Sequence, residues 1–416
     1  MLRPTRGGVV SSAIDRVQRS IPVSRIHAQN FRSFRDVDVQ LGPLTVLVGP
    51  NGSGKSNLLK VLQFISTAAR FDLDVALSQW GGFDHVLRQS TRAQAQSVEL
   101  EIEGQVTRLA SENAPDHYRL LVTRKKNGEL TRTEELAFKR LEGRGRRIKV
   151  RDSAVTIEAG ELQTQRNLAS RTTTGLGALA QFAQDEVGPQ PAAYVRFLTS
   201  MRVLEPDVAA AREPSRYSEG RLADDAHNLA SALANLQAAS TDAFAALVSD
   251  LAACLPGLER IELAPIGGAG RAFVVQLHER GVRRPIELAD ASYGTVRLLA
   301  LLVALHEPDP PAFTAIEELD HGLHPYALEV LVDRMRAASA KTQILAATHS
   351  PTLVNRLEPH EVLIAERDYE TGESIIPARN AEEIASAIRS TVDEDSGSSR
   401  GIGELWFAGA LGGVPA

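Results

Sequence analysis

The sequence has little cysteine, little lysine and few aromatic residues, and it lacks long apolar runs. Its 416 residues contain one cysteine, Cys254, which excludes an internal disulfide and a cysteine-based zinc site and fits a reducing compartment. No stretch approaches the roughly 18 consecutive apolar residues of a membrane helix. We therefore expect a cytoplasmic protein with no membrane partner. Only 7 of the 46 basic residues are lysine, which we interpret as genome base composition, not function.

The composition that remains is that of a globular protein with room for a large core. Hydrophobic residues make up 43% of the chain, which excludes a fully disordered protein. The length corresponds to about two to three domains. The net charge of −6 excludes a globally basic nucleic-acid binder, although local basic patches remain open.

Apolar patterning along the chain predicts an α/β protein with motifs near both ends. Turn-bounded apolar segments predict strands at 24–31, 36–41 and 43–49, and helical spacing follows at 57–71. Further strands are predicted within 97–159, a mainly helical stretch at 163–255, clearest at 229–255, and a strand pair at 260–266 and 272–279. We find no repeats and no sustained heptads. Residues 1–23 are predicted to be a flexible extension, and 393–399 have the composition of a linker.

A phosphate-binding loop follows the apolar strand that ends at Val48. Residues 49–56, GPNGSGKS, match G-x-x-x-x-G-K-[ST] at every position, between a strand and a helix. Glycines let the backbone N–H groups point inward at phosphate oxygens, and the helix N-terminus adds partial positive charge. Lys55 should reach the β- and γ-phosphates and Ser56 should bind Mg²⁺. The predicted ATP-binding residues here are Gly49, Asn51, Gly52, Ser53, Gly54, Lys55, Ser56 and Asn57.

A second group of candidate residues lies near the other end of the chain. Glu317 and Glu318 end an apolar strand, where one carboxylate can join the Mg²⁺ shell and the other can deprotonate an attacking water. His349 ends the next apolar strand, in a position to contact a γ-phosphate. Ser292 and Gly294 precede a strongly apolar helix, whose free N–H groups can form an anion site.

The order of these motifs resembles that of ABC-type ATPase heads, most closely the RecF/SMC-like branch of P-loop ATPases. The resemblance rests on NFRSF at 30–34, the phosphate loop, the acidic motif at 317–325, THSP at 348–351 and the closing ELWFAGALGGVP. It is strong over 24–104 and 285–367. It implies an α/β P-loop NTPase fold in which a mixed sheet flanked by helices is assembled from both ends of the chain, with an inserted α+β, mainly helical lobe between them.

The resemblance also implies a role for each matching residue. Glu317 takes the Mg²⁺-associated position, Glu318 that of the general base and His349 that of the switch histidine. Ser292 and Gly294 would form a signature loop that binds ATP held by a second subunit, so that a homodimer encloses ATP. His324 would lie in the interface loop, Arg32 would contact nucleotide, and Gln79, with Gln63 as the alternative, would sense Mg²⁺ and the attacking water. Two departures are Leu319, where proline is usual, and Ala291, where leucine is common.

The chain divides, on this interpretation, into an N-terminal half of the ATPase domain at 24–104, an inserted lobe at 105–284, a C-terminal half at 285–367 and a tail at 368–416. Residues 119–151 include twelve basic and four acidic residues, which gives this stretch a net charge of +8. This stretch either binds DNA through contacts with its phosphates or is the solvated face of a hairpin. The candidate DNA contacts are Arg140, Arg144, Arg146, Arg147 and Lys149.

The sequence therefore predicts an ATP-hydrolysing, Mg²⁺-dependent enzyme that dimerises around ATP and takes part in DNA repair, recombination or a related DNA transaction. No nuclease constellation is found, so any cutting would come from a partner nuclease. The alternative is a nucleotide-dependent regulatory scaffold for a separate effector protein, for example in anti-phage defence, without direct DNA binding. A membrane-transporter ATPase subunit is disfavoured by the large insert and the NFRSF start.

Overall fold

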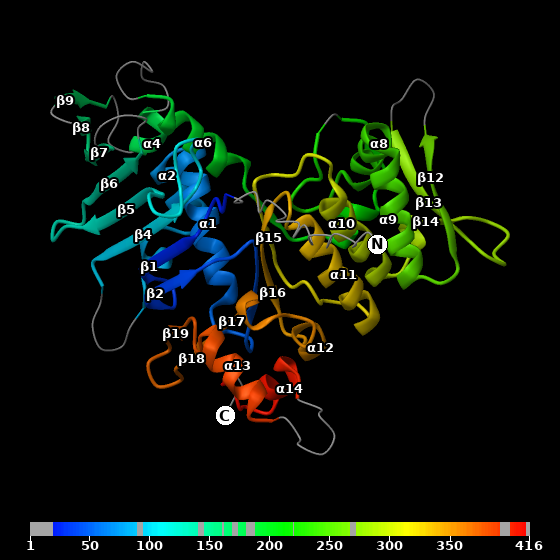
Figure 1. The fold of residues 1–416 in the computed structure, drawn as a ribbon. Helices are drawn as coiled ribbons and strands as arrows, with labels where there is room; N and C mark the ends of the chain where they lie inside the picture. Colours follow the sequence, from blue (N-terminus) through cyan, green and yellow to red (C-terminus); the bar gives the residue numbers. More distant parts are fainter. Residues whose placement is uncertain are drawn as a thin grey trace, which may run out of the picture.

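The computed structural model describes residues 20–89, 95–139, 145–159, 162–168, 174–179, 188–218, 220–266, 272–391 and 400–412 (Figure 1). Residues 1–19 of the predicted extension, and the predicted linker at 393–399, lie outside these ranges. Val23, the last residue of that predicted extension, is fully buried and its N–H donates to Oε1 of Gln343 at 2.9 Å. Val23 is therefore part of the packed structure.

A five-stranded parallel sheet positions the predicted site. Its order is β10-β15-β16-β3-β17, so β3, from near the N-terminus, lies between two strands from the C-terminal part of the chain. Every residue of β3, β15 and β16 is buried, as expected for parallel strands covered by helices on both faces. The strands are β3 (Leu44–Val48), β10 (Arg202–Leu204), β15 (Phe313–Ile316), β16 (Gln343–Thr348) and β17 (Val362–Ile364).

Strand β10 comes from the stretch predicted to be mainly helical. That prediction is wrong for these three residues, because the fully buried run Arg202–Leu204 pairs in parallel with β15. The pairing extends past the strand, where the N–H of Glu317 donates to the carbonyl of Leu204 at 3.1 Å. The middle of the chain therefore supplies an edge strand to the sheet that carries Glu317.

A second sheet of eight antiparallel strands has the order β2-β1-β4-β5-β6-β7-β8-β9. Alternating buried and half-buried residues along β4 match a sheet with one face on the core. Strands β4 and β5 pair along their length, so the sheet runs unbroken past residue 104, where the predicted ATPase half meets the predicted lobe. The strands are β1 (Arg25–Phe31), β2 (Phe34–Gln40), β4 (Ser97–Gly104), β5 (Asp116–Arg124), β6 (Leu130–Phe138), β7 (Arg146–Arg151), β8 (Ala154–Ala159) and β9 (Leu162–Asn167).

Helix α1 (Lys55–Arg70) lies between the two sheets. Its apolar residues share one core with Leu47 and Leu345 of the parallel sheet and with the inner face of the antiparallel sheet. A second core covers the other face of the parallel sheet with α10 (Tyr293–His306) and α11 (Pro325–Ala338). The parallel sheet is thus enclosed on both faces, and its carboxyl edge carries the loops described below.

A smaller group of elements packs beside α10. The predicted helical run at 229–255 is two helices, because Ser240 interrupts it and its hydroxyl accepts a hydrogen bond from the N–H of Ala243, capping the second helix. This group contains α7 (Val208–Arg212), α8 (Leu229–Ala239), α9 (Thr241–Cys254), β11 (Ser215–Arg216), β12 (Leu258–Ile266), β13 (Ala272–Glu279) and β14 (Ile286–Glu287).

The C-terminal tail docks beside the loop that follows β16. The side-chain oxygen of Asn355 accepts a hydrogen bond from the N–H of Gly403 at 2.7 Å, which ties α14 to α12. The remaining elements are α2 (Leu73–Gln79), α3 (Phe83–Val86), α4 (Gly175–Leu179), α6 (Gln190–Ser200), η1 (Leu288–Asp290), α12 (Pro351–Val354), η2 (Pro359–Glu361), β18 (Glu366–Arg367), β19 (Ser374–Ile375), α13 (Ala381–Arg389) and α14 (Ile402–Phe407). None of the helices in the described ranges has the length and apolar character needed to span a bilayer.

Candidate active site

The loop of residues 49–56 joins β3 to α1 and has the backbone that its glycines permit. Gly52 and Gly54 have φ of 79° and 104°, a region that residues with a side chain rarely adopt. A Cβ at Gly49 would collide with the carbonyl oxygen of Ala365. The loop therefore presents its backbone N–H groups at the N-terminus of α1, where an anion is favoured.

Lys55 is the first residue of α1, and its side chain folds back along the loop. Its Nζ donates to the carbonyl oxygens of Gly49 at 2.8 Å and Pro50 at 2.9 Å. Burial lowers the pKa of Lys55 to about 8, although the carboxylates of Asp320 and Glu318 oppose this shift. The lysine is thus held at the loop and partly desolvated.

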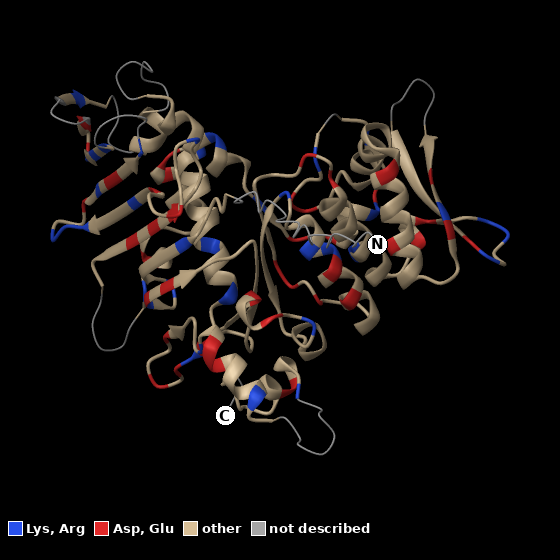
Figure 2. Ribbon diagram, viewed as in Figure 1, with Lys and Arg blue, Asp and Glu red and all other residues tan. Residues whose placement is uncertain are grey.

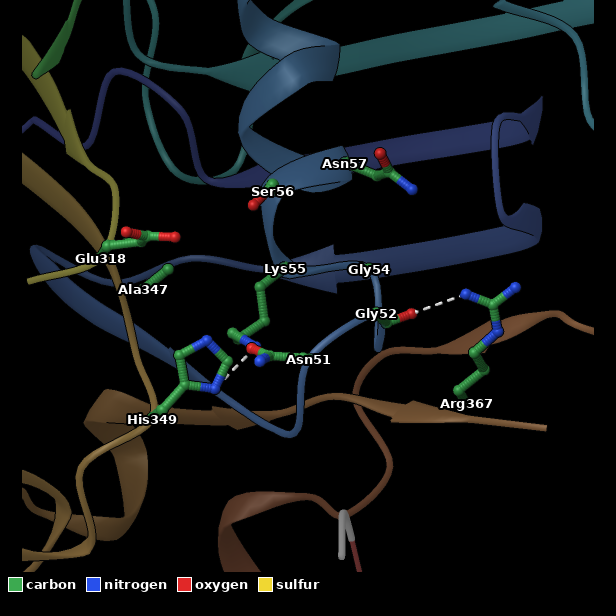
Figure 3. A pocket seen from close by; sticks show the side chains of 10 residues that line it. All are labelled: Asn51, Gly52, Gly54, Lys55, Ser56, Asn57, Glu318, Ala347, His349 and Arg367. Carbon is green, nitrogen blue, oxygen red and sulfur yellow. Dashed lines mark hydrogen bonds between the residues drawn. The ribbon is translucent and has the colours of Figure 1, made fainter. Parts of the chain in front are cut away.

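A cavity of about 210 Å³ lies over this loop. Figure 3 shows Glu318 and His349 on one side of it, Lys55 between them and the loop, and Arg367 on the other side. It is lined by Asn51, Gly52, Gly54, Lys55, Ser56, Asn57, Glu318, Ala347, His349 and Arg367. The fold therefore brings together the residues predicted for phosphate binding, the predicted base and the predicted switch histidine. Gly49 and Ser53, also predicted for ATP binding, belong to the loop but do not line this cavity.

Glu317 and Glu318 follow β15 and face different surroundings. Glu317 is 8% exposed. Burial and the charge of Glu205 raise the pKa of its carboxyl, while a hydrogen bond with Ser56 opposes that shift. Two of the three residues predicted for the Mg²⁺ site, Ser56 and Glu317, thus lie together. Glu318 is exposed and lies at the cavity, with a φ of 48°.

Glu205 was missed by sequence reasoning. It follows β10 directly, and the parallel pairing of β10 with β15 brings it beside Glu317. The only signal was an acid after the short apolar run Arg202–Leu204, and that run is too brief to predict a strand.

Leu319 stands where the resembling family usually has proline, and the structure shows what the change permits. Its N–H donates to the carbonyl of Ala347 at 2.9 Å, a bond that proline cannot form. Leu319 is fully buried. The departure therefore adds a link between the acidic turn and β16.

His349 follows β16 and is held by the loop after the acidic pair. Oδ1 of Asp320 accepts hydrogen bonds from Oγ1 of Thr348 at 2.7 Å and from the N–H of His349 at 3.1 Å. Burial, and then the charge of Lys55, lower the pKa of His349. The imidazole is therefore neutral at physiological pH and has one N–H to donate.

The predicted signature and interface residues lie outside the cavity. Ser292 caps α10, its Oγ accepting a hydrogen bond from the N–H of Thr295 at 3.2 Å. Gly294 approaches so closely that a Cβ would collide with the carbonyl of Gly322. His324 caps α11 and is exposed, as is Ser292. None of the three lines the cavity, so a role in nucleotide binding requires another molecule.

The predicted sensor glutamine and the predicted nucleotide-contacting arginine differ in their placement. Gln79 is exposed at the end of α2 and does not line the cavity, and its alternative, Gln63, is half-buried in α1. Arg32 has a φ of 51° and lies over the ring of Trp80, 4.8 Å from its centroid. It lines a second cavity, of about 430 Å³, together with Ser33, Asp84, His85, Leu87, Gln89, Arg367 and Gly372.

Arg367 is a further residue that the sequence did not indicate. It lies on β18, lines both cavities, and donates from Nη1 to the carbonyl of Gly52 at 3.0 Å. The hairpin that carries it is fastened to the turn after β1, where the N–H of Ser374 donates to the carbonyl of Ser33 at 2.9 Å. No motif marks this arginine, because it reaches the loop only through the pairing of β17 with β3.

The predicted DNA contacts that the structure describes lie on β7 and differ in their exposure. Arg147 and Lys149 are exposed on β7, whereas Arg146, the first residue of that strand, is half-buried. Arg146 and Arg147 both line a cavity of about 550 Å³, together with Lys139 and Glu158. Acidic and basic residues are mixed across the sheet (Figure 2), and Glu158 and Glu135 oppose Arg147 and Lys149. Arg140 and Arg144 lie outside the described residues.

Parts of this chain are similar in sequence to known proteins. A RecF DNA replication and repair protein of Beutenbergia cavernae is 37% identical over 99 residues, 22% of this chain and 25% of that protein. An OLD nuclease of Thermus scotoductus is 44% identical over 43 residues, 10% of this chain and 8% of that protein. The chain thus matches a quarter or less of the length of these relatives.

Solved structures show the fold more completely. The Smc head domain from Pyrococcus furiosus, crystallised with the C-terminal domain of ScpA, has a TM-score of 0.55 at 12% identity, covering 89% of this chain and 99% of that one. The predicted P-loop fold class is thereby confirmed. A family model described as "AAA domain, putative AbiEii toxin, Type IV TA system" matches residues 44–355. This chain therefore belongs to that AAA-domain family and is a P-loop ATPase of the ABC/RecF/SMC-like type.

Proposed function

We propose that this protein binds ATP with Mg²⁺ in the cavity over residues 49–56, hydrolyses it to ADP and phosphate, and dimerises head to head around ATP in a DNA transaction. The observation that carries the proposal is the convergence of Lys55, Glu318 and His349 on one cavity from three neighbouring strand ends. A phosphate cradle alone would support binding, whereas a carboxylate at its edge supports hydrolysis.

The side chains present suit Mg²⁺. The Ser56 hydroxyl and the Glu317 carboxylate lie together, and burial of the carboxylate leaves a charge that a divalent cation would offset. Ser56 and Glu317 would hold the ion, with Glu205 beside them. When bound, Mg²⁺ neutralises phosphate charge and orients the oxygens of the β- and γ-phosphates.

The hydrolytic roles follow from the arrangement of the side chains. Lys55 binds the phosphates through Nζ, in place of its present bonds to the loop carbonyls. Glu318 accepts a proton from the attacking water as that water bonds to the γ-phosphorus and the bond to the ADP oxygen breaks. The neutral His349 donates a hydrogen bond to the γ-phosphate. The second cavity, beyond Arg367, has room for the nucleoside, and there Arg32 would contact it.

The dimer proposal rests on the exposure of Ser292 and His324 outside the cavity. Residues at a helix N-terminus can bind a phosphate, but Ser292 and His324 do not line this chain's own cavity. A second copy would bring its own ATP to them.

The test of hydrolysis is the Glu318→Gln variant. The wild-type chain should hydrolyse MgATP, and the variant should bind ATP, fail to turn it over and accumulate as a dimer in sizing by light scattering. Glu382→Gln, an exposed carboxylate on α13, is the matched control and should behave as wild type. Normal turnover by Glu318→Gln would refute the role of Glu318.

The test of the DNA role is a salt titration. If Arg147 and Lys149 bind double-stranded DNA, the affinity should fall steeply as the salt concentration rises. Binding should be lost in the Arg147→Glu/Lys149→Glu variant. The control is Arg283→Glu/Arg284→Glu, a matched pair of exposed arginines between β13 and β14. ATP turnover should be measured with and without DNA.

The second candidate is a nucleotide-dependent scaffold for an effector protein. The family description names a toxin–antitoxin system, and the acids opposing Arg147 and Lys149 weaken the case for DNA. An absence of DNA binding at low salt, with and without ATP, would favour this candidate. Both candidates keep the same ATP site.

A further inference from the structure

Arg297 is a buried arginine in the second turn of α10, a helix that is otherwise almost wholly apolar. It is 2% exposed. Its Nη1 donates to the carbonyl of Pro206 at 3.3 Å. Its Nη2 donates to the carbonyls of Glu317 at 3.1 Å and Glu318 at 2.7 Å. The guanidinium thus joins α10 to both residues of the acidic pair and to the segment after β10.

The turn that Arg297 holds has an unfavourable backbone. Glu318 has a φ of 48°, which a residue with a Cβ adopts only when its surroundings impose it. Two successive carbonyls, those of Glu317 and Glu318, converge on one guanidinium nitrogen. The turn is held from two further directions, since the N–H of Glu317 bonds to Leu204 and that of Leu319 to Ala347. The direction of the Glu318 side chain follows from this conformation.

The same turn is packed against the N-terminus of α10. Gly294 lies against the carbonyl of Gly322, with no room for a Cβ. The hydroxyl of Tyr293 lies 3.2 Å from Nδ1 of His321, and that nitrogen lies 3.4 Å from the Glu318 carboxylate. The turn after β15 thus contacts α10 at two places, at the exposed start of the helix and at the buried Arg297.

The choice of arginine is informative because burying a cation against carbonyls is costly. A buried charge without a carboxylate is a poor source of stability, and an apolar residue would suit this helix. The planar guanidinium, however, offers several donors in fixed directions, which lysine cannot reproduce. The arrangement therefore favours a role in geometry.

We propose that Arg297 is a positioning residue that fixes the turn at Glu317–Glu318, so that the Glu318 carboxylate faces the cavity, and that it couples this turn to the start of α10. The inference rests on the proposed function, because it takes Glu318 as the base. It assigns Arg297 no contact with ATP.

The experiment compares Arg297→Lys with Arg202→Lys in the full chain. Arg202 is similarly buried, at 3% exposure, but bonds Glu307 at 2.9 Å through both Nη atoms, away from the cavity. Arg297→Lys should lower kcat by about 10²-fold, the order expected when a catalytic group is misplaced by about 1 Å. Its ATP affinity should stay within about threefold of wild type, as should both parameters of Arg202→Lys.

Two readouts separate positioning from general stability. In the Glu318→Gln background, Arg297→Lys should not reduce the residual rate further, since the group that it positions is already absent. Amide hydrogen exchange at Leu319 should quicken in Arg297→Lys while exchange in the core of α11 is unchanged.

The outcomes distinguish this inference from the proposed function. If the wild type does not hydrolyse ATP, or Glu318→Gln hydrolyses it normally, the proposed function fails. If those two proteins behave as proposed, the inference alone is overturned by an unchanged kcat in Arg297→Lys, by an equal loss in the Glu318→Gln background, or by ATP affinity falling in step with kcat.

Discussion

The Nζ atom of Lys55 lies 3.4 Å from Nδ1 of His349, although 294 positions separate the two residues in the chain. The reason is the parallel pairing of β3 with β16, in which Val48 is opposite Thr348. The carboxyl ends of neighbouring parallel strands meet at one edge of a sheet, which is where ligands bind in open α/β folds. The phosphate loop and the predicted switch histidine are therefore brought to the same cavity.

The first prediction concerns His349. His349→Ala should lower kcat by about 10² to 10³-fold, the usual loss when one donor to a developing charge is removed, and should change ATP affinity less. Steady-state kinetics and equilibrium ATP binding would measure the two effects. His360→Ala serves as control, because His360 lies on η2 and does not line the cavity. An unchanged kcat in His349→Ala would exclude a contact that matters in the transition state.

The second prediction concerns pH and Lys55. Its pKa of about 8 in the nucleotide-free protein lies below the ordinary value because of burial, and bound phosphate should raise it again. Above pH 8, Lys55 of the nucleotide-free protein is mostly neutral, so ATP binding must be accompanied by uptake of a proton. The affinity for ATP should therefore weaken as the pH rises from 7 to 9. Phosphate groups are already ionised in this range.

Calorimetry in buffers of different ionisation enthalpy would measure that proton uptake directly. It should be small at pH 7, where Lys55 is already charged, and should approach one proton per site near pH 9. Binding enthalpies at pH 8.5 that do not depend on the buffer would contradict the assignment.

The third prediction concerns Arg367, which lines both cavities and bonds to Gly52. Arg367→Ala should raise the KM for ATP by about tenfold, which corresponds to the loss of about one charged hydrogen bond. Its kcat should stay within about threefold of wild type. Arg379→Ala, an exposed arginine that lines neither cavity, should leave KM as in wild type. A fall in kcat at constant KM would instead place Arg367 among the groups that act in the transition state.

The fourth prediction concerns stability and the ion pair between Arg336 and Glu361. Burial alone would raise the pKa of Glu361, but hydrogen bonds from Arg336 at 2.7 and 2.9 Å, and from the backbone of Glu358, outweigh it and lower that pKa. A depressed carboxyl pKa contributes stability above the unfolded value of about 4.3 and loses it as pH falls through the folded value.

Glu361→Gln should therefore reduce the free energy of unfolding by about 1 to 2 kcal/mol at pH 7. The difference from wild type should shrink below about pH 4, because the wild-type carboxyl is then protonated as well. Denaturant unfolding at both pH values tests this, with the exposed Glu370→Gln as control. A difference that persists at low pH would show that packing, not charge, is responsible.

The parts of the site that could be predicted are those encoded by short spacing. The glycines at 52 and 54 and the positions of Lys55 and Ser56 follow from the needs of a phosphate loop, and each appears in the structure at the start of α1. Apolar runs ending in Glu317 and His349 likewise predicted strand ends. The three-residue strand β10 could not be predicted, because its pairing with β15, not its own pattern, defines it.

Local pattern thus determined the loop, the helix that follows it and the acids and histidine at the strand ends, because each depends on backbone conformation within a few residues. The order β10-β15-β16-β3-β17 was decided by tertiary structure alone, since it depends on which buried strands pack side by side. That order places Glu205 beside Glu317, Arg367 against Gly52 and Arg297 under the turn at Glu318. In the antiparallel sheet, tertiary structure likewise decided that Arg146 is half-buried while Arg147 is exposed, because one face of β7 lies on the core.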